Sequence, residues 1–265
     1  MIKFKDFIPP LFVKILKKNF IKEKLQYGFL GNYNSWEEAK KNCTGYDSDI
    51  IIEKVKNAAF KVKNGEAVYE RDSVLFDKIQ YSYPLLTGLM WVAAQNGGNL
   101  NALDFGGALG STYFQNKHFL NSLNCVQWNI VEQEKFVETG KLYFEDEHLK
   151  FYHSISECIN KNNIDIIILS GVIQYLETPE IFLKEVISYG FKFIIIDRTL
   201  FNNVHSDTLT IQKVSPEIFD ASYPCWFLDK NKFKEIFKEK YDLILEFDGF
   251  CEGKGFIFKK KDERI

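Results

Sequence analysis

A glycine-rich turn and two acidic residues are the features of the sequence with the clearest chemical potential. The turn, DFGGALG (104–110), follows a short apolar run and precedes an expected helix. Glycines at such a turn let the backbone approach a ligand closely. Glu132 ends the next apolar run and could accept hydrogen bonds from both hydroxyls of a ribose. Together with Asp104 in the turn, this predicts a nucleoside-containing ligand; a tight turn without a ligand is the alternative.

Two classes of nucleotide cofactor fit this layout. A dinucleotide fingerprint requires Gly-x-Gly-x-x-Gly, so that the backbone can approach a pyrophosphate. Counted from Gly106, Ala108 and Ser111 stand where that pattern needs its other two glycines. S-adenosylmethionine carries no phosphate, and an acid in the turn can serve its ammonium group directly or through water. The sequence therefore favours S-adenosylmethionine, and an NAD-dependent enzyme remains the alternative.

The segment LDFGGALGS (103–111) resembles the first motif of the class I S-adenosylmethionine-dependent methyltransferases, with Ala108 in place of the middle glycine. More narrowly, the chain is similar to methyltransferases of bacterial surface-polysaccharide (capsule or lipopolysaccharide) gene clusters, from about Gly31 to its end. The segments that carry this similarity are GYDSDIIIEKV (45–55), YERDSVLF (69–76), LDFGGALGSTYFQN (103–116), SGVIQYL (170–176), DRTLF (197–201) and SYPCWFL (222–228).

This resemblance implies an α/β protein with the Rossmann-like class I methyltransferase fold: a seven-stranded, mostly parallel sheet with one antiparallel strand, and an N-terminal helical extension. It implies S-adenosyl-L-methionine as the cofactor. The implied activity is O-methylation, in the cytoplasm, of a small precursor of a bacterial capsule or other surface polysaccharide. The acceptor would be a sugar hydroxyl, for example in a nucleotide-linked sugar, or a phosphate-type substituent. A non-catalytic partner subunit with the same fold is a further alternative.

The expected cofactor-binding residues come from the turn and from the ends of the second and fourth strands. They are Asp104, Gly106, Gly107, Ala108, Gly110, Ser111, Glu132, Gln133, Ser170, Gly171, Val172 and Gln174. The turn is expected to line the methionine end, Glu132 to bind the ribose hydroxyls and Gln133 to lie beside the adenine. For Glu132 the alternative is an ordinary solvated start of a helix.

Methyl transfer is an in-line displacement at a sulfonium carbon, in which the enzyme chiefly aligns donor and acceptor. A hydroxyl acceptor must also lose a proton, which a general base would take. His205 is the first choice for that base because an imidazole can accept a proton at neutral pH, and Asp207 would orient or replace it. Tyr175 is the next candidate, and Arg198 suits an anionic group of the acceptor such as a phosphate. The alternatives are a surface position for His205, a core position for Tyr175 and an ion pair for Arg198.

The elements that would hold these residues alternate from residue 99 onward. Expected strands are 101–105, 126–132, 149–153, 164–170, 192–197, 241–248 and 255–260, and expected helices are 111–123, 133–144, 178–189 and 229–240. Strands that alternate with helices predict a mostly parallel sheet. The last two strands have no helix between them and are expected to be antiparallel neighbours.

The first third of the chain reads as helical. Residues 1–96 are expected to form a helical extension or cap, and 97–265 the S-adenosylmethionine-binding domain. Expected helices begin near Ser35, as an N-cap with Glu38 as its capping-box partner, and span 49–64 and 83–96. Residues 1–24 carry seven lysines and two acidic residues, a net charge of +5, with apolar residues at helical spacing. We expect this helix to pack on the main domain; contact with a membrane surface is the alternative.

Composition excludes several classes of protein. With 46% hydrophobic and 26% charged residues over 265 positions, the chain is typical of a globular protein. Thirty-four basic against 36 acidic residues leave a net charge of −2, without the basic excess that nucleic-acid binding favours. Five cysteines without a CxxC pair predict a reduced, cytoplasmic chain, and four histidines without zinc spacing predict no metal site. We find no signal-peptide pattern and no 18-residue apolar run, and the oligomeric state stays open.

Overall fold

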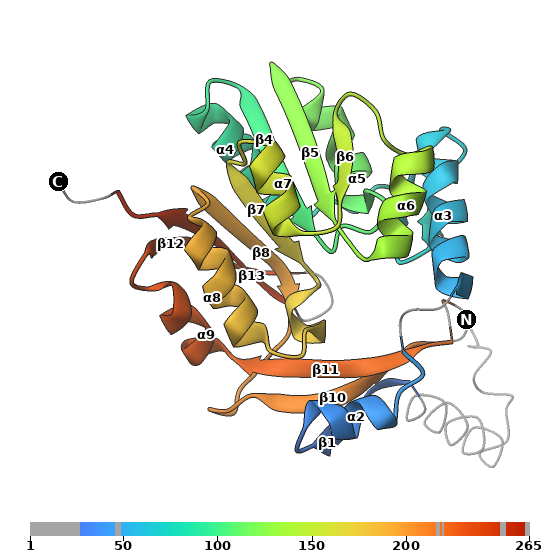
Figure 1. Ribbon diagram of the computed structural model, residues 1–265, viewed down its shortest axis with the longest axis vertical. Coiled ribbons are helices and arrows are strands. Elements are labelled where there is room, and N and C mark those ends of the chain that lie inside the picture. Colours follow the sequence, from blue (N-terminus) through green and yellow to red (C-terminus); the bar gives the residue numbers. More distant parts are fainter. Residues whose placement is uncertain (1–26, 46–48, 216–217, 219, 250–252, 263–265) are drawn as a thin grey trace, which may run out of the picture. The chain divides into compact units, whose positions relative to one another are not determined.

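Figure 1 shows a computed structural model of the chain, which describes residues 27–45, 49–215, 218, 220–249 and 253–262. The chain forms two compact units. The larger comprises Asp47–Thr208 and Trp226–Ile265, and the smaller comprises Met1–Tyr46 and Leu209–Cys225. The helix expected within residues 1–24 lies outside the described residues.

The larger unit is built on a sheet of seven strands, counted over the described residues, in the order β12-β13-β8-β7-β4-β5-β6. The strands are β4 (Asn99–Phe105), β5 (Cys125–Val131), β6 (Leu149–Tyr152), β7 (Ile166–Ser170), β8 (Phe193–Thr199), β12 (Tyr241–Asp248) and β13 (Lys254–Lys260). Strand β13 runs antiparallel to both of its neighbours, and the pairs from β6 to β8 are parallel. The expected fold class, including the antiparallel pair at the end of the chain, is confirmed.

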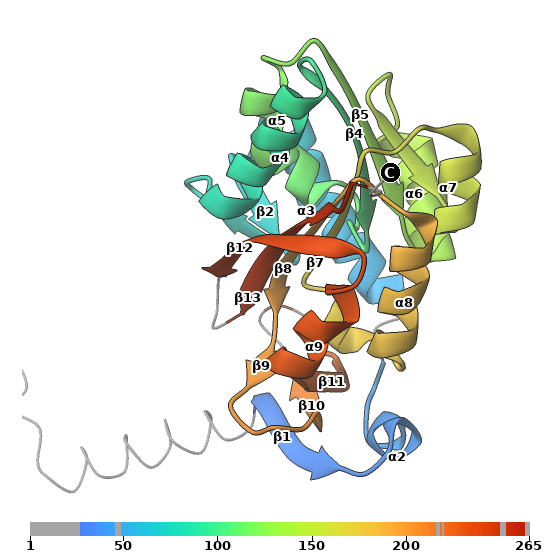
Figure 2. The same ribbon diagram turned by 90° about the vertical axis from the view of Figure 1, so that its left-hand side faces the viewer.

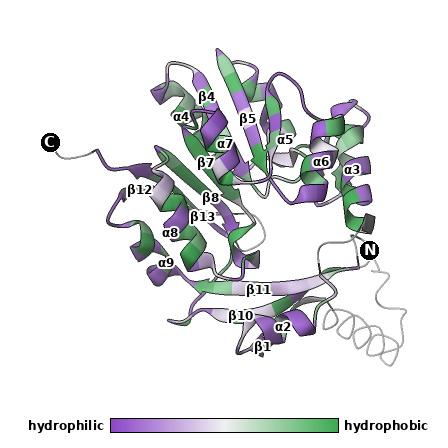
Figure 3. Cartoon of the chain, viewed as in Figure 1, coloured by the Kyte–Doolittle hydropathy of each residue, from purple (hydrophilic) through white to green (hydrophobic). Residues whose placement is uncertain are grey.

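Helices cover both faces of this sheet, and Figure 2 shows α4 and α5 on one side with α7 and α8 on the other. The helices of this unit are α3 (Asp49–Lys63), α4 (Tyr83–Gln95), α5 (Ser111–Leu120), α6 (Glu134–Tyr143), α7 (Ile155–Lys161), α8 (Pro179–Tyr189) and α9 (Lys230–Phe237). Strand β7 is buried along its whole length, as a continuous apolar run predicts for a central parallel strand, and β7 and β8 are mainly green in Figure 3. Burial of such apolar surface is the main force that holds these layers together.

The strand order creates a position where ligands can bind at the carboxyl ends of the parallel strands. After β4 the chain builds β5 and β6 on one side, then crosses to β7 and β8 on the other. In open α/β sheets ligands bind at the carboxyl ends of the strands, where the order reverses in this way. Phe105, Val131 and Ser170 end the three strands that meet around this point.

A hairpin in the larger unit departs from the helical pattern expected for residues 35–96. Strands β2 (Tyr69–Arg71) and β3 (Val74–Phe76) pair antiparallel and are joined by Asp72 and Ser73. Both joining residues have positive φ angles, 51° and 67°. Two-residue hairpin turns of this kind usually carry glycine or asparagine, so their absence here hid the hairpin from sequence analysis.

The smaller unit holds β1 (Gly28–Tyr33), α2 (Trp36–Lys41), and most of β10 (Thr208–Lys213) with the first half of β11 (Ser222–Asp229). Strand β1 pairs antiparallel with β10, and these strands were not expected. Helix α2 begins as predicted, because the Ser35 hydroxyl accepts a hydrogen bond from the Glu38 N–H at 3.2 Å. The Glu38 carboxylate accepts from the Asn34 N–H rather than from that of Ser35. Over the described residues, we find no helix with the length and apolar character needed to cross a membrane.

Candidate active site

The glycine-rich turn leads from β4 into α5 at the carboxyl edge of the sheet. Gly106, Ala108 and Gly110 all have positive φ angles, of 72°, 50° and 101°. A Cβ atom at Gly106 would lie 2.8 Å from Cγ2 of Val172, which follows β7. Glycine at 106 is therefore required both by the backbone conformation and by the close approach of Val172.

Glu132 follows β5 and its carboxylate lies against this turn. Its Oε1 accepts a hydrogen bond from the Ala108 N–H at 3.3 Å, and its Oε2 accepts from the Gln133 N–H at 2.7 Å. Burial raises the pKa of Glu132, and these two hydrogen bonds oppose that rise. A carboxylate has about four lone-pair positions, so each oxygen can still accept from one hydroxyl. The half-buried Glu132 is therefore suited to a vicinal diol.

Asp104 lies beneath the turn rather than at its surface. The residue is 1% exposed, and the Trp128 Nε1–H donates to its Oδ2 at 3.3 Å. A Cβ at Gly107 would lie 2.7 Å from this carboxyl group. Burial raises the pKa of Asp104 to about 7. The structure thus gives Asp104 a role in supporting the turn, and its expected contact with an ammonium group stays a prediction.

Ser111 connects the start of α5 to the hairpin. Its hydroxyl donates to the carboxylate of Glu70, which is 2% exposed on β2. The second Glu70 oxygen accepts from the Ser73 N–H at 3.3 Å, and burial raises the Glu70 pKa. Ser111, expected to contact the cofactor, thus has a partner that sequence analysis missed, and together they fix the hairpin on α5.

The carboxyl ends of β7 and β8 bring Ser170 and Arg198 together. The Arg198 Nε–H donates to the Ser170 hydroxyl at 3.2 Å, and Nη2 donates to the Ser170 carbonyl at 3.4 Å. Gln174 donates from Nε2 to the Arg198 carbonyl at 3.1 Å. Arg198 itself has a φ of 53°, in the left-handed region that few non-glycine residues adopt. Several contacts therefore hold Arg198 in a strained conformation, a pattern that is common at functional sites.

A cavity of about 250 Å³ opens beside these residues. Its walls are formed by hairpin strand β2, the segment before α4, the start of α5 and the ends of β7 and β8. Ser111, Ser170 and Arg198 are the expected site residues that line it. Arg71, Ser82 and Asp197 also line it, although sequence analysis gave no site role to Arg71 or Ser82. The segment YERDSVLF (69–76) was a signal, since it carries both Arg71 and Glu70.

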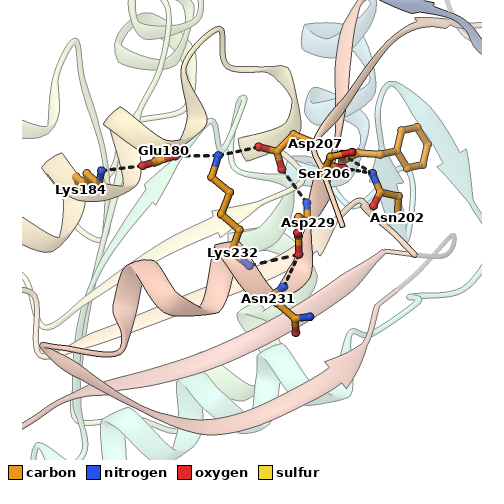
Figure 4. A network of polar contacts seen from close by, with 9 residues as sticks. Glu180, Lys184, Asn202, Ser206, Asp207, Asp229, Asn231 and Lys232 are labelled. Carbon is orange, nitrogen blue, oxygen red and sulfur yellow. Dashed lines mark hydrogen bonds and ion pairs between the residues drawn. The ribbon is translucent and has the colours of Figure 1, made fainter. Parts of the chain in front are cut away.

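The three expected catalytic residues other than Arg198 lie elsewhere. Asp207 accepts from the Asp229 N–H at 2.8 Å and forms an ion pair with Lys232 at 3.1 Å (Figure 4). It lines a second cavity, of about 400 Å³, formed by residues of α8, α9 and the end of β11. Exposed His205 lies in the loop after β9 (Phe201–Asn202), and half-buried Tyr175 in a short helical turn after β7. Over the described residues, neither lines the first cavity.

In the described part of the chain, we find no cluster of three or more His, Cys, Asp or Glu side chains placed to hold a metal ion.

Comparison with known proteins gives similarity at the level of structure. Neither a scan against protein-family models nor a search of curated proteins finds a match. The N-terminal domain of EvdMO1 with SAH bound shares 10% identity over 79% of this chain and 97% of that chain, with a TM-score of 0.46. Burkholderia thailandensis 1,6-didemethyltoxoflavin-N1-methyltransferase, bound to 1,6-didemethyltoxoflavin and S-adenosylhomocysteine, shares 10% identity over 83% of this chain and 93% of that chain, with a TM-score of 0.43. The glycopeptide N-methyltransferase MtfA complexed with sinefungin shares 9% identity over 67% of this chain and 94% of that chain, with a TM-score of 0.46.

Proposed function

We propose that this chain is an S-adenosylmethionine-dependent methyltransferase. The observation that carries the proposal is the Glu132 carboxylate, which accepts from the Ala108 N–H where β4, β5 and the glycine-rich turn meet. Its remaining lone pairs fit the two ribose hydroxyls of the cofactor. Dinucleotide-binding domains place an acid at the same position, so the turn makes the distinction: Ala108 and Ser111 stand where the dinucleotide pattern needs glycines.

The protein's own part in the reaction is to bind and align. When bound, the cofactor supplies a methyl group activated by its sulfonium charge. Glu132 would hold the ribose, and the turn from Gly106 to Gly110 lets the backbone approach the cofactor closely. Ser170 and Arg198 lie at the strand ends beside the cavity, where an acceptor would be aligned for in-line attack.

The finer assignment concerns the acceptor. We propose O-methylation of a small precursor of a bacterial capsule or other surface polysaccharide, in the cytoplasm, at a sugar hydroxyl or a phosphate-type substituent. Support for this comes from the similarity of the segments between Gly31 and the end of the chain to methyltransferases of such gene clusters. For a hydroxyl acceptor, His205 stays our candidate for the general base, with Asp207 and Tyr175 after it.

Two measurements test the proposal in order. Calorimetry on the full chain should show binding of S-adenosylhomocysteine, and thermal unfolding should shift upward with its concentration. NAD should give neither effect; binding of NAD without S-adenosylhomocysteine would instead identify the dinucleotide enzyme. The chain is then incubated with S-adenosylmethionine and a panel of capsule precursors, and released S-adenosylhomocysteine and methylated product are measured. Cofactor binding without turnover of any precursor would contradict the polysaccharide assignment.

A further inference from the structure

Two arginines from distant parts of the sequence line the first cavity. Arg71 ends hairpin strand β2, and Arg198 lies in β8, at its carboxyl end. Guanidinium groups bind phosphate and carboxylate through pairs of parallel N–H donors, which is why arginine is favoured where such anions are recognised. The question is whether the surroundings hold these two groups ready for a ligand or neutralise them.

Arg198 is held in place without being neutralised. Its guanidinium uses two of the five N–H groups that the side chain carries, both directed to Ser170. Over the described residues, it forms no ion pair with a carboxylate. The contacts to Ser170 fix its orientation, so little conformational entropy is lost when a ligand binds. The other donors stay available to an anion.

Arg71 is positioned by the hairpin. Its Nε–H donates to the Tyr69 hydroxyl at 2.9 Å, and the centre of its guanidinium lies 5.5 Å from the centre of the Tyr69 ring. The hairpin is in turn held on α5 by the hydrogen bond from Ser111 to Glu70. The contacts with Tyr69 thus orient the Arg71 side chain, and the attachment of the hairpin to α5 fixes the position of its backbone at the cavity wall.

The acids at the cavity wall already have partners. Asp197 is 2% exposed, and its Oδ1 accepts from the Arg198 N–H at 3.0 Å while Ser82 hydrogen-bonds to the same carboxyl group. Burial raises the Asp197 pKa, while the nearby Arg198 and Arg71 act in the opposite direction. Asp248 forms an ion pair with Lys254. The cavity wall therefore carries two guanidinium groups and, besides the paired Asp248, one carboxyl group, which leaves positive charge for a negatively charged ligand.

We propose that Arg71 and Arg198 together bind an anionic group, a phosphate or carboxylate, of the acceptor substrate. This proposal rests on the proposed function and narrows the acceptor to a phosphorylated or carboxylated small molecule. Both arginines would hold the anion while a neighbouring oxygen of the same molecule is presented for methylation.

The cofactor's own carboxylate is the other source of such an anion. The Arg198 side chain reaches from β8 to Ser170 at the end of β7, the strand that neighbours β4 and the glycine-rich turn. S-adenosylhomocysteine carries this carboxylate, so the experiment below separates the two sources by competition with phosphate.

The test measures binding of inorganic phosphate to the full chain by calorimetry, with S-adenosylhomocysteine titrated in parallel. The variants are Arg71→Gln and Arg198→Gln, and the matched control is Lys78→Gln, which removes one positive charge from an exposed position just after the hairpin. We expect each arginine variant to weaken phosphate binding by at least about tenfold, the loss of charge-assisted hydrogen bonds. Lys78→Gln should change it less than about twofold, because an exposed charge is screened by solvent and salt.

Each outcome has one meaning for the proposal. Phosphate binding that the arginine variants leave intact would overturn it, as would an equal loss in the Lys78 variant. S-adenosylhomocysteine should bind all four proteins alike and should not compete with phosphate. If it competes, or if its affinity falls together with that of phosphate, the anion belongs to the cofactor and the acceptor assignment is wrong. If Arg198→Gln lowers thermal stability, a loss of phosphate binding in that variant could come from altered folding, and the phosphate affinity of Arg71→Gln alone then decides. Failure of the wild-type chain to bind S-adenosylhomocysteine would refute the proposed function, while the phosphate measurement would still report on the arginines.

Discussion

The guanidinium of Arg198 lies against the backbone of Gly171, so close that a Cβ at residue 171 would be 3.2 Å from Nη2. The two residues occupy equivalent places on neighbouring strands, since Ser170 pairs with Asp197 and each is followed by a residue with positive φ. Glycine adopts this conformation at no steric cost, whereas arginine pays about 1–3 kcal/mol. Gly171 therefore provides the space in which the strained Arg198 side chain is held.

Gly171→Ala should disturb Arg198 as well as the backbone. The added methyl group would lie 3.2–3.4 Å from the Nη2, Cζ and Nε atoms of Arg198. The alanine would also have to adopt a φ of 68°. We expect a loss of unfolding free energy of about 1–2 kcal/mol and weaker phosphate binding. The control is Gly65→Ala, where φ is 75° but nothing lies within 4 Å of the added atom. Denaturant unfolding and calorimetry on both variants separate the two effects, and equal phosphate affinity in both would contradict this placement of Arg198.

Glu132→Ala should weaken S-adenosylhomocysteine binding by about 1.5–3 kcal/mol, since two charge-assisted hydrogen bonds are lost. The fold should survive, because Glu132 is half-buried at the end of a strand rather than part of the core. Calorimetry measures the affinity, with Glu138→Ala as the control on the exposed face of α6. Gly106→Val should be worse than Glu132→Ala because the added side chain would collide with Val172. An affinity that Glu132→Ala leaves unchanged would remove the ribose assignment.

Ser111→Ala should destabilise the larger unit. The substitution removes a hydrogen bond to Glu70, a carboxylate that is 2% exposed and that still accepts from the Ser73 N–H. Leaving a buried charged group with fewer partners costs about 1–3 kcal/mol. Ser122→Ala, which removes an exposed hydroxyl bonded to a carbonyl at the end of α5, should change stability by less than half of that. Urea unfolding of both variants measures the difference.

The sheet was predictable from sequence because its strands are continuous apolar runs bounded by turns, and each run lies within a few residues of a strand in the structure. Glu132 could likewise be placed, because an acid directly after a strand must lie at the carboxyl edge of the sheet. Hairpin β2–β3 could not, because its strands are three residues long and its turn lacks glycine. Helix α7 was missed for a similar reason: it has seven residues, too few for a clear helical period, despite the Ser154 N-cap.

The cavity depends on contacts that no local pattern contains. Arg71 lines it because the hairpin is held on α5 by Glu70 and Ser111, and Arg198 lines it because Ser170 holds its side chain. The positive φ of Arg198 is imposed by surrounding contacts and leaves no mark in the sequence. Asp207 illustrates the reverse case, since its position two residues after His205 suggested a pair, whereas the structure joins it to Lys232 and Asp229 (Figure 4).

Asp104→Asn should make the stability of the protein depend less on pH. In the folded protein the Asp104 pKa is raised to about 7 from an ordinary value of 3.8, so between these values the folded state holds a proton that the unfolded chain has lost. Its contribution to the free energy of unfolding therefore falls as pH rises from about 4 to about 7, by at most about 1.4 kcal/mol per unit.

Asparagine cannot ionise and can still accept from Trp128 Nε1. The stability of Asp104→Asn relative to wild type should thus increase from pH 4 to pH 7 and level off above it. Urea unfolding across this range measures the difference, with Asp77→Asn, at an exposed position, as the control. Parallel curves for wild type and Asp104→Asn would show that the carboxyl group is not buried as described.

His205→Ala tests whether the reaction needs a general base. If His205 takes the acceptor proton, its removal should lower turnover by about 10²–10⁴, because that is the usual contribution of a positioned base. Cofactor affinity and stability should stay unchanged, since His205 is an exposed residue of the loop after β9. Asn203→Ala, two residues earlier in the same exposed loop, controls for changes in the loop itself.

A fall in turnover of less than about tenfold would remove His205 from the role and pass it to Asp207, then to Tyr175. For Asp207 the variant is Asp207→Asn, which can still accept from the Asp229 N–H but loses its charge beside Lys232. A stability loss without a turnover loss would then mark Asp207 as structural, in keeping with its two contacts. If all three variants keep most of their activity, the methylated oxygen carries no proton that must be removed. The acceptor atom would then be an already ionised oxygen, such as that of a phosphate-type group.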